Sequence, residues 1–383
     1  MTILGIFLNN EIRTGGHRRY LELLEDLAEK GHRVLVLLNE DLDYAPKSFN
    51  EVRLKARYVR RSFPPASTVF RTSVRRNLGK IITAASNVDW ILIHGETHLL
   101  TAVFLKRQLG CKLLFGIRSN VVRWSSISMR ENRLRPLAFF SALKEHLTYR
   151  IYEKIAAKNA DKLAFQSTYD QNDFIERAPK GKEKTVIIGG NIGEPRFKPE
   201  HRNINSSTTL KKLLFVGTLG ERKGLRYLLE ALSILRERGI DNLELDVLGR
   251  NTDDTVHSVF AAEHGLQNQV RFQGRVADPF PFYASSDLLV VPSLFDSYPD
   301  TIIEALHTGT PVIASRVGGM PDQLAYNELL FPPRDSRALA DILGELTRNP
   351  DTYLRLRELC ARRQKAFHFD WAQKWEEAMK KII

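Results

Sequence analysis

The hydrophobic residues in the first half of the chain fall into short runs separated by amphipathic stretches. Leu and Tyr recur at helical spacing between the first two runs, and Gly31 ends this predicted helix. A second helical stretch covers residues 99–109. The alternation predicts a parallel sheet covered by helices. The runs with the length of buried strands are 3–8, 32–38, 90–94, 112–117 and 162–167.

A second alternating series follows a polar segment. Residues 198–211 are rich in Ser, Thr and Asn and poor in apolar residues, which is typical of a linker. The strands predicted after it are 212–217, 243–249, 270–274, 287–293 and 311–315. The helices predicted there are 225–238, 255–264, 301–307 and 336–349. Two such series predict an α/β protein with two Rossmann-like domains.

The composition is that of a globular protein. The 383 residues are 43% hydrophobic and 27% charged, which excludes a collagenous, low-complexity or wholly disordered chain. The length fits two domains at roughly 150 residues each. The 57 Lys and Arg outnumber the 45 Asp and Glu, so the net charge is +12. This excess favours anionic partners: nucleic acid, phosphorylated small molecules or an acidic membrane face.

The cysteines and the N-terminus indicate the compartment. Cys111 and Cys360 lie far apart without metal-binding spacing, so we expect neither a disulfide framework nor a zinc site. No apolar run approaches the roughly 18 residues of a membrane span. Residues 1–16 have no basic segment before their apolar stretch and no small-residue cleavage site. We therefore expect a cytoplasmic protein.

Two carboxylates flank the predicted start of a helix near the end of the chain. Asp296 follows the strand at 287–293. Seven residues separate it from Glu304, which lies one turn into a helix predicted to begin near Thr301. Ligands bind at this edge of doubly wound sheets, where free helical N–H groups suit an anion. The arrangement predicts a site for hydroxyls and phosphate. The alternative is an ordinary acid that complements the helix dipole.

Two other segments place candidate groups at the same kind of edge. Lys223 lies between the strand at 212–217 and the next helix, where a diphosphate would be held, although a solvated charged turn is the alternative. Gly15 and Gly16 precede the first helix and would let the backbone approach a ligand closely. The pattern is not G-x-G-x-x-G, so dinucleotide binding is not indicated.

With these motifs in place, the sequence resembles a known family across nearly its whole length. It is similar to the retaining, nucleotide-sugar-dependent glycosyltransferases of the GT-B fold, glycosyltransferase family 4. The segment PSLFDSYPDTIIEALHTGTPVIASRVGGMPD resembles the family's E-x7-E block and its continuation. FVGTLGERKG resembles the family's glycine-lysine segment, and TGGHRRYLELLEDLAEKGHRVLVL resembles its N-terminal glycine turn, helix and strand.

The resemblance implies two Rossmann-like domains that face each other across a cleft. The acceptor-binding domain would comprise residues 1–197 together with a C-terminal crossover helix at 366–383. Residues 198–211 would be the linker. The nucleotide-sugar donor domain would comprise residues 212–365.

The resemblance also implies roles in the donor domain. Glu304 would accept hydrogen bonds from the ribose hydroxyls, and Asp296 would hold hydroxyls of the transferred sugar. Lys223 would neutralise the diphosphate. The base pocket would be edged by the backbone at Arg275 and Val276. The amides expected to contact the sugar and the diphosphate are those around Ser297, Tyr298, Pro299, Asp300 and Thr301.

In the acceptor domain, the resemblance implies that Gly16, preceded by Gly15, places its amide beside the distal phosphate. His94, which ends the strand at 90–94, corresponds to a family histidine near the reacting sugar; a histidine satisfied by backbone is the alternative. Arg118 follows the strand at 112–117 and is a further phosphate candidate, with a surface salt bridge as the alternative.

The sequence departs from the family pattern in four places, one of which is Gly189-Gly190-Asn191-Ile192, where the family commonly has P-N-G-V. Asp296 stands where the family has Glu, so its side chain is one methylene shorter. Thr218 stands where the family often has Arg, which leaves phosphate neutralisation to Lys223, with Arg222 or with Arg118 from the facing domain. The glycine-rich stretch after the strand at 243–249 is reduced to Gly249-Arg250-Asn251.

The implied reaction is transfer of a hexosyl group, with retention, from a UDP- or GDP-linked sugar to a glycan or lipid-linked glycan of the cell envelope. Lys223 and helix N-termini can stabilise the leaving diphosphate without metal. We find no D-x-D in a suitable strand-end loop, so we expect no divalent cation and no cofactor. The alternatives are a sugar-nucleotide epimerase or hydrolase on the same fold, and a non-catalytic scaffold.

The basic segments of the first domain indicate which partners it binds. Residues 53–80 carry nine Lys and Arg and no acid, and residues 118–150 interleave basic with apolar and aromatic residues. Together with amphipathic helices, these segments predict docking on an anionic inner membrane surface. A solvated basic face is the alternative. Nucleic acid is not an expected partner, because no recognised motif for it is present.

Overall fold

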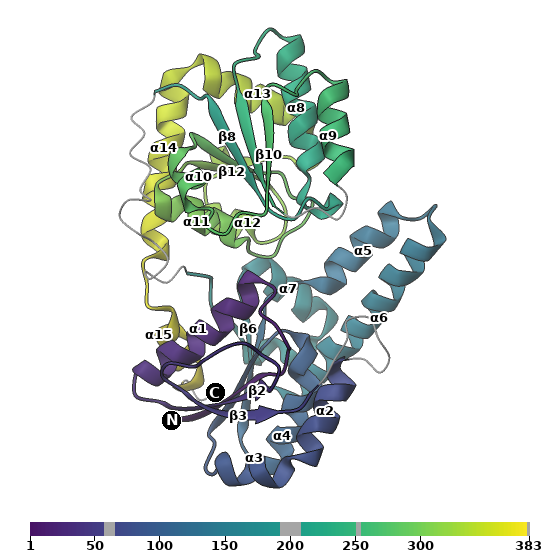
Figure 1. Cartoon of the computed structure of the whole chain (residues 1–383), viewed down its shortest axis with the longest axis vertical. Helices are drawn as coiled ribbons and strands as arrows, with labels where there is room; N and C mark the ends of the chain where they lie inside the picture. Colours follow the sequence, from purple (N-terminus) through teal and green to yellow (C-terminus); the bar gives the residue numbers. More distant parts are fainter. Residues whose placement is uncertain (57–65, 192–207, 250–253, 381–383) are drawn as a thin grey trace. The chain divides into compact units, whose positions relative to one another are not determined.

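The structure is a computed structural model that describes residues 1–56, 66–191, 208–249 and 254–380 (Figure 1). Contacts between Cα atoms divide the chain into two compact units. Unit 1 comprises Met1–Gly189 and Asp370–Ile383, and unit 2 comprises Gly190–Phe369. The sequence predicted the corresponding domain boundaries at residues 197 and 365. Residues 198–207 of the expected linker lie outside the described residues, so the linker stays a prediction.

Unit 1 is built on a parallel sheet with the strand order β3-β2-β1-β4-β5-β6-β7. The order reverses at the β1–β4 pair, which is where doubly wound sheets bind ligands. The strands are β1 Thr2–Phe7, β2 Arg33–Asn39, β3 Asn50–Leu54, β4 Trp90–His94, β5 Lys112–Ile117, β6 Lys162–Phe165 and β7 Thr185–Ile187. The helices are α1 Gly15–Glu29, α2 Ala66–Arg76, α3 Leu78–Ala84, α4 Leu99–Leu109, α5 Val121–Glu131, α6 Pro136–Asn159, α7 Thr168–Arg177 and α15 Trp371–Lys380.

Unit 2 repeats this arrangement with the strand order β10-β9-β8-β11-β12-β13. Its reversal lies at the β8–β11 pair. The strands are β8 Lys212–Val216, β9 Glu244–Leu248, β10 Val270–Gly274, β11 Leu288–Val291, β12 Val312–Ser315 and β13 Leu330–Phe331. The helices are α8 Leu225–Glu237, α9 Asp254–Glu263, α10 Phe280–Ser285, α11 Asp300–Thr308, α12 Met320–Leu324, α13 Ser336–Arg348 and α14 Pro350–Gln364. The predicted α/β fold with two Rossmann-like sheets is confirmed.

Three strands, β3, β7 and β13, have no counterpart among the strands predicted from the sequence. Each pairs with a single neighbour at the end of its sheet. β3 begins with two exposed residues, β7 is not fully buried at any position, and β13 has only two residues. Edge strands therefore lack the continuous apolar run that marks the buried central strands.

A tyrosine separates β1 from β4 at the reversal in unit 1. The strands pair from Ile3 to Gly5 on β1. Beyond that point, the buried Tyr20 hydroxyl accepts a hydrogen bond from Ile6 N at 2.9 Å and donates one to Leu92 O at 2.6 Å. Helix α1 thus inserts a side chain between the strands and satisfies backbone groups that would otherwise pair with each other. This positions the loops at the carboxyl ends of both strands.

The C-terminal helix α15 belongs to unit 1, although unit 2 precedes it in the chain. It packs beside α1 (Figure 1). Trp371 Nε1 donates to Gly189 O at 3.0 Å, and the Arg19 guanidinium lies 4.2 Å from the Trp371 ring centre. The sequence predicted a helix at this end of the chain. Among the described residues, no helix is long and apolar enough to cross a membrane.

Candidate functional site

Lys223 and Asp296 meet at the carboxyl end of the sheet in unit 2. Lys223 ends a short 3-10 turn after β8, and Asp296 lies in the loop between β11 and α11. Lys223 Nζ is 2.6 Å from Asp296 Oδ2, and Arg222 Nη1 is 3.3 Å from the same oxygen. The side chains of Lys223 and Asp296 are only 14% and 13% exposed, so solvent screens their attraction less than that of a surface pair.

The charges around Asp296 decide its protonation state. Burial alone would raise the pKa of the Asp296 carboxyl, but the charges of Lys223 and Arg222 and the Lys223 hydrogen bond hold this pKa below its ordinary value. The carboxylate is therefore ionised at neutral pH. Because two cations surround one anion, the cluster has a surplus positive charge, which suits a phosphate group.

Two glycines fix the loops that bring these side chains together. Gly224 has φ +68°, and a Cβ there would lie 2.0 Å from Pro292 O. Gly318, after β12, has φ +56°, and a Cβ there would lie 1.9 Å from Asp296 O. Only glycine combines this backbone conformation with such close approach. Gly319 N then donates to Asp296 O at 3.1 Å, so the β12 loop holds the backbone of Asp296.

Glu304 lies one turn inside α11 and is held by a tyrosine from α10. The Tyr283 hydroxyl donates to Glu304 Oε2 at 2.8 Å. Tyr283 is fully buried, and burial together with the Glu304 charge raises the pKa of its phenol well above the ordinary value. The hydroxyl therefore keeps its proton and orients the carboxylate. Sequence reasoning missed Tyr283, because no pattern relates an aromatic on one helix to an acid on the next.

The predicted amide segment leads directly into α11. Ser297 and Pro299 are buried, Tyr298 and Asp300 are half-buried, and α11 begins at Asp300. Gln323 Nε2 donates to Pro299 O at 3.0 Å and so fixes the entry to the helix. Among the described residues, the buried Thr301 Oγ1 has no hydrogen-bond partner. A buried hydroxyl of this kind is available to a ligand or a water molecule.

The remaining candidates in unit 2 lie at the same edge of the sheet. Thr218 is exposed in the turn after β8. Arg275 is exposed after β10, and Val276 packs against the core of the unit. Gly249 follows β9, while Arg250 and Asn251 lie outside the described residues. The candidates therefore come from the loops after four neighbouring strands, β10, β9, β8 and β11.

In unit 1 the structure brings together Gly16, in the first turn of α1, and Arg118, in the loop after β5. Gly15 and Gly16 open α1, whose N-cap Thr14 accepts a hydrogen bond from His17 N at 3.2 Å. A Cβ at Gly16 would lie 3.3 Å from Arg118 Nε. Gly16 therefore leaves room for the Arg118 guanidinium beside the first turn of the helix.

His94 ends β4 next to these residues and is tightly enclosed. Its ring centre lies 4.9 Å from that of Tyr20 and 4.7 Å from that of Trp375 on α15. Both ring nitrogens are buried and have no hydrogen-bond partner among the described residues. Burial, followed by the charges of Arg118 and Arg19, holds the pKa of His94 well below its ordinary value. His94 is therefore neutral at physiological pH.

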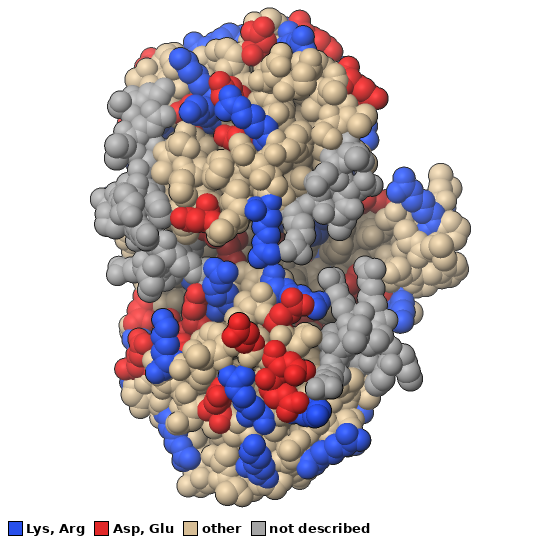
Figure 2. Space-filling model, in the orientation of Figure 1, with Lys and Arg blue, Asp and Glu red and all other residues tan. Residues whose placement is uncertain are grey.

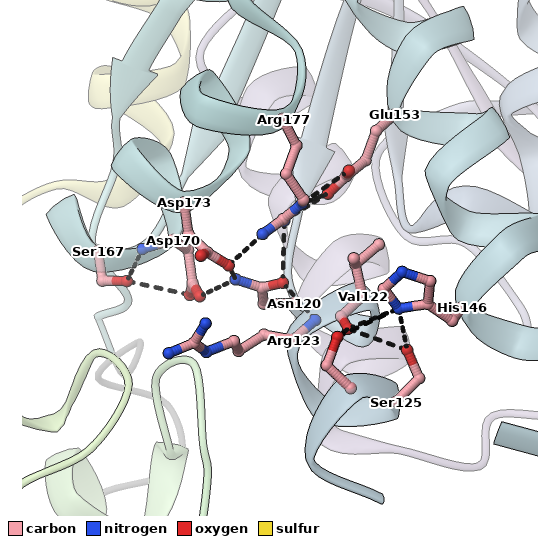
Figure 3. Close-up of polar contacts among 11 residues, drawn as sticks. Asn120, Val122, Arg123, Ser125, His146, Glu153, Ser167, Asp170, Asp173 and Arg177 are labelled. Atoms are coloured by element: carbon pink, nitrogen blue, oxygen red, sulfur yellow. Dashed lines mark hydrogen bonds and ion pairs between the residues drawn. The ribbon is translucent and has the colours of Figure 1, made fainter. Parts of the chain in front are cut away.

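A polar network anchors the loop that carries Arg118 (Figure 3). Asn120 Nδ2 donates to Asp170 Oδ1 at 3.0 Å and to Asp173 Oδ2 at 2.6 Å. Arg177 donates to Asn120 Oδ1 at 3.1 Å and forms a two-point ion pair with Glu153. Sequence reasoning missed this network. Its only signal is the helical spacing of Asp170, Asp173 and Arg177, which places the three on one face of α7.

The expectation that no divalent cation is needed stays a prediction. One D-x-D sequence, Asp41-Leu42-Asp43, follows a strand, β2 of unit 1. Leu42 is buried there, and its carbonyl accepts a hydrogen bond from Arg53 Nη1 at 2.9 Å. Across the described ranges, no group of three or more His, Cys, Asp or Glu side chains is arranged to hold a metal ion.

Comparison with known proteins matches both units to family models. Residues 14–189 match the Glycosyl transferase 4-like domain, and residues 210–349 match Glycosyl transferases group 1. The chain is 29% identical over 245 residues to the D-inositol 3-phosphate glycosyltransferase of Corynebacterium glutamicum (strain R). That match covers 58% of this chain and 57% of the relative, so the chain spans little more than half the length of this relative.

The fold is similar to solved structures over nearly the whole chain. Sucrose-phosphate synthase from Thermosynechococcus elongatus matches with a TM-score of 0.78 at 23% identity, covering 98% of this chain and 97% of that one. The Anabaena protein HepE, solved in complex with UDP, matches with a TM-score of 0.73 at 18% identity, covering 100% of both chains. At these identities the likeness shows the fold.

Proposed function

Because the chain belongs to the GT-B glycosyltransferases of family 4, we propose that it transfers a hexosyl group from a nucleoside-diphosphate sugar to a glycan or lipid-linked glycan. The observation that carries this proposal is the cluster at the β8–β11 reversal, where Lys223 and Arg222 surround Asp296 beside the helix that holds Glu304. Cations, a fixed carboxylate and a helix N-terminus are the groups that a sugar diphosphate needs.

Each part of the donor meets a matching group in this proposal. The Glu304 carboxylate, oriented by Tyr283, accepts hydrogen bonds from the ribose hydroxyls. The diphosphate lies at the N-terminus of α11 and takes Lys223 as its counter-ion. Asp296 accepts hydrogen bonds from hydroxyls of the sugar. Thr301, whose hydroxyl is buried without a partner among the described residues, contributes a further hydrogen bond.

The chemistry follows from this placement. The bond between the sugar's anomeric carbon and the phosphate oxygen breaks, and its electron pair leaves on the diphosphate. Lys223 and the α11 amides stabilise the charge that develops there, which is where preorganised donors lower a barrier most. An acceptor hydroxyl attacks from the face that the diphosphate leaves, and its proton passes to the departing phosphate oxygen. This order retains the anomeric configuration without an enzyme nucleophile.

Unit 1 supplies the acceptor side of the proposal. Gly16 N and Arg118 form an anion-binding element at the start of α1, suited to the distal phosphate. His94 serves as a neutral hydrogen-bonding group for the reacting sugar, which requires one of its buried nitrogens to become accessible. A neutral imidazole can donate with one nitrogen and accept with the other.

We further propose that the reaction needs no divalent cation, because Lys223 and Arg222 already supply positive charge where a metal would otherwise stand. The nucleotide is proposed to be UDP or GDP, and UDP is supported by the similar HepE structure, which contains it. The proposed setting is synthesis of cell-envelope polysaccharide in the cytoplasm, at an anionic membrane surface that carries lipid-linked acceptors.

Donor breakdown followed by proton NMR tests the proposal. The protein is incubated with UDP-glucose, UDP-galactose, GDP-mannose and ADP-glucose without acceptor, with and without EDTA. We expect one donor to be hydrolysed slowly, with its original anomer appearing first and no effect of EDTA. Appearance of the opposite anomer, or of an epimerised nucleotide sugar, would contradict the proposed reaction. Acceleration by glycan or lipid-linked acceptors then separates a transferase from a hydrolase.

A further inference from the structure

Helices α5 and α6 form a hairpin that extends away from the sheet of unit 1 (Figure 1). The two helices pack against each other, and the Asn120–Arg177 network fixes the base of the hairpin to α7. The hairpin is therefore a firmly anchored projection.

The tip and outer face of this hairpin expose large apolar side chains. Leu134 and Leu137 are 94% and 90% exposed, more than any other large apolar side chain in the described residues. Phe140, Leu147 and Ile151 are each more than half exposed. Along α6 the exposed positions 137, 140, 144, 147 and 151 alternate steps of three and four, so they form one stripe. At about 1.5 Å per residue the stripe is about 21 Å long.

Basic residues accompany this stripe. Arg130, Arg133 and Arg135 are exposed around the tip, and Lys144 and Lys154 lie on the stripe itself. Residues 121–159 contain eight Lys and Arg against three Asp and Glu. One of these acids, Glu153, is paired with Arg177. The outer part of the hairpin in Figure 2 accordingly shows uncharged surface with Lys and Arg at its margins.

We propose that the stripe of Leu134, Leu137, Phe140, Leu147 and Ile151 docks the protein on an anionic lipid surface. An interfacial helix buries an apolar face among the acyl chains while flanking Lys and Arg contact acidic headgroups. The long aliphatic stems of Lys144 and Lys154 let their ammonium groups reach the headgroups from within the stripe. A second copy of the chain is the poorer occupant, because it would bring the same cations against each other.

This inference names the membrane element for the proposed lipid-linked acceptor, and in that respect it rests on the proposed function. The docking itself does not depend on turnover. Binding to vesicles is measured without donor, so the two proposals can fail separately.

The test is co-sedimentation of the full chain with phosphatidylcholine vesicles, with and without phosphatidylglycerol. The variant Leu134→Ser/Leu137→Ser/Phe140→Ser removes the apolar tip. All three side chains are largely exposed, so the variant should unfold at the wild-type temperature. The matched control is Val256→Ser/Val259→Ser on α9, which removes exposed apolar side chains from unit 2.

We expect the wild type and the control to bind only the vesicles that contain phosphatidylglycerol, less tightly as salt rises. The tip variant should bind at least about tenfold more weakly, because it no longer buries three large apolar side chains in the lipid. Equal binding by the tip variant, equal binding to both kinds of vesicle, or no binding by the wild type would overturn the proposal. A wild-type dimer in light scattering that the tip variant loses would assign the stripe to a second copy instead.

Discussion

Lys223 Nζ and Asp296 Oδ2 lie 2.6 Å apart in unit 2, although the residues are separated by 73 positions in the chain. Each belongs to a loop that follows a different parallel strand, and Gly224 and Gly318 allow those loops to approach. The pair explains how a charged lysine is tolerated in a largely buried site. Asp296 compensates the charge of Lys223 until a diphosphate competes for the lysine.

Replacing Lys223 should affect turnover far more than folding. We expect Lys223→Met to lower the rate of donor breakdown by about a hundredfold or more, as loss of one charge-stabilising group typically does. It should also lower the free energy of unfolding by roughly 1–3 kcal/mol, because among the described residues Arg222 is the counter-ion that Asp296 keeps. Steady-state kinetics and denaturant titration measure both effects. Lys212→Met, at an exposed position on β8, should change neither.

The carboxylate of Glu304 should be required for recognition of the ribose hydroxyls. The wild type is expected to bind a nucleoside diphosphate roughly ten to a hundred times more tightly than its 2′,3′-dideoxy analogue, since hydrogen bonds to a charged group are worth about 1.5–3 kcal/mol. Glu304→Gln should remove most of this difference. Tyr283→Phe, which removes one hydrogen bond to the carboxylate, should reduce it partly. Calorimetric titration of both ligands measures the ratio, and an unchanged ratio in Glu304→Gln would exclude a ribose contact.

A side chain at position 318 should displace the backbone of Asp296. Alanine at this position would have φ +56° and a Cβ 1.9 Å from Asp296 O, so the backbone that carries Asp296 must move. Gly239→Ala provides the control, because Gly239 has φ +78° with no atom within 4 Å of a Cβ. The free energy of unfolding of the control should fall by about 1 kcal/mol from left-handed backbone strain alone. For Gly318→Ala it should fall further, and donor breakdown should also be slower. Equal losses of stability in the two variants would show that the loop tolerates the shift.

His98 gives a prediction about pH. It is buried beside Phe7 and Phe70, and burial lowers the pKa of its imidazole to about 3. The pKa of the imidazole in the unfolded chain is near 6.5. Between this pH and pH 3, His98 is therefore protonated in the unfolded chain and neutral in the folded chain. The wild type loses up to about 1.4 kcal/mol per pH unit in this window as the pH falls.

The variant His98→Leu removes this loss. Relative to pH 7.5, its stability advantage over the wild type at pH 5 should grow by about 2 kcal/mol. Comparing the two pH values cancels any change in packing, which acts equally at both. Denaturant titrations give the four free energies of unfolding. No growth of the advantage at pH 5 would mean that His98 is protonated in the folded state.

The sequence was sufficient for the central strands and for the edge where the site lies. Central parallel strands are buried on both faces, so β1, β5 and β11 stand out as apolar runs, and parallel strands send Lys223 and Asp296 to the same edge of the sheet. The contacts themselves could not be predicted. Tyr283 holds Glu304 from another helix, and Trp375 encloses His94 from the far end of the chain, because packing rather than local pattern selects these partners.

The central claim is that unit 2 holds a nucleotide-sugar donor through Glu304 and Lys223. Isothermal titration of UDP, GDP and ADP into the wild type and Glu304→Ala, each with and without EDTA, tests it most directly. The account predicts that one of the three nucleotides binds the wild type, that EDTA leaves the affinity unchanged, and that Glu304→Ala weakens it at least about tenfold. No binding by any nucleotide, or equal binding by Glu304→Ala, would contradict it.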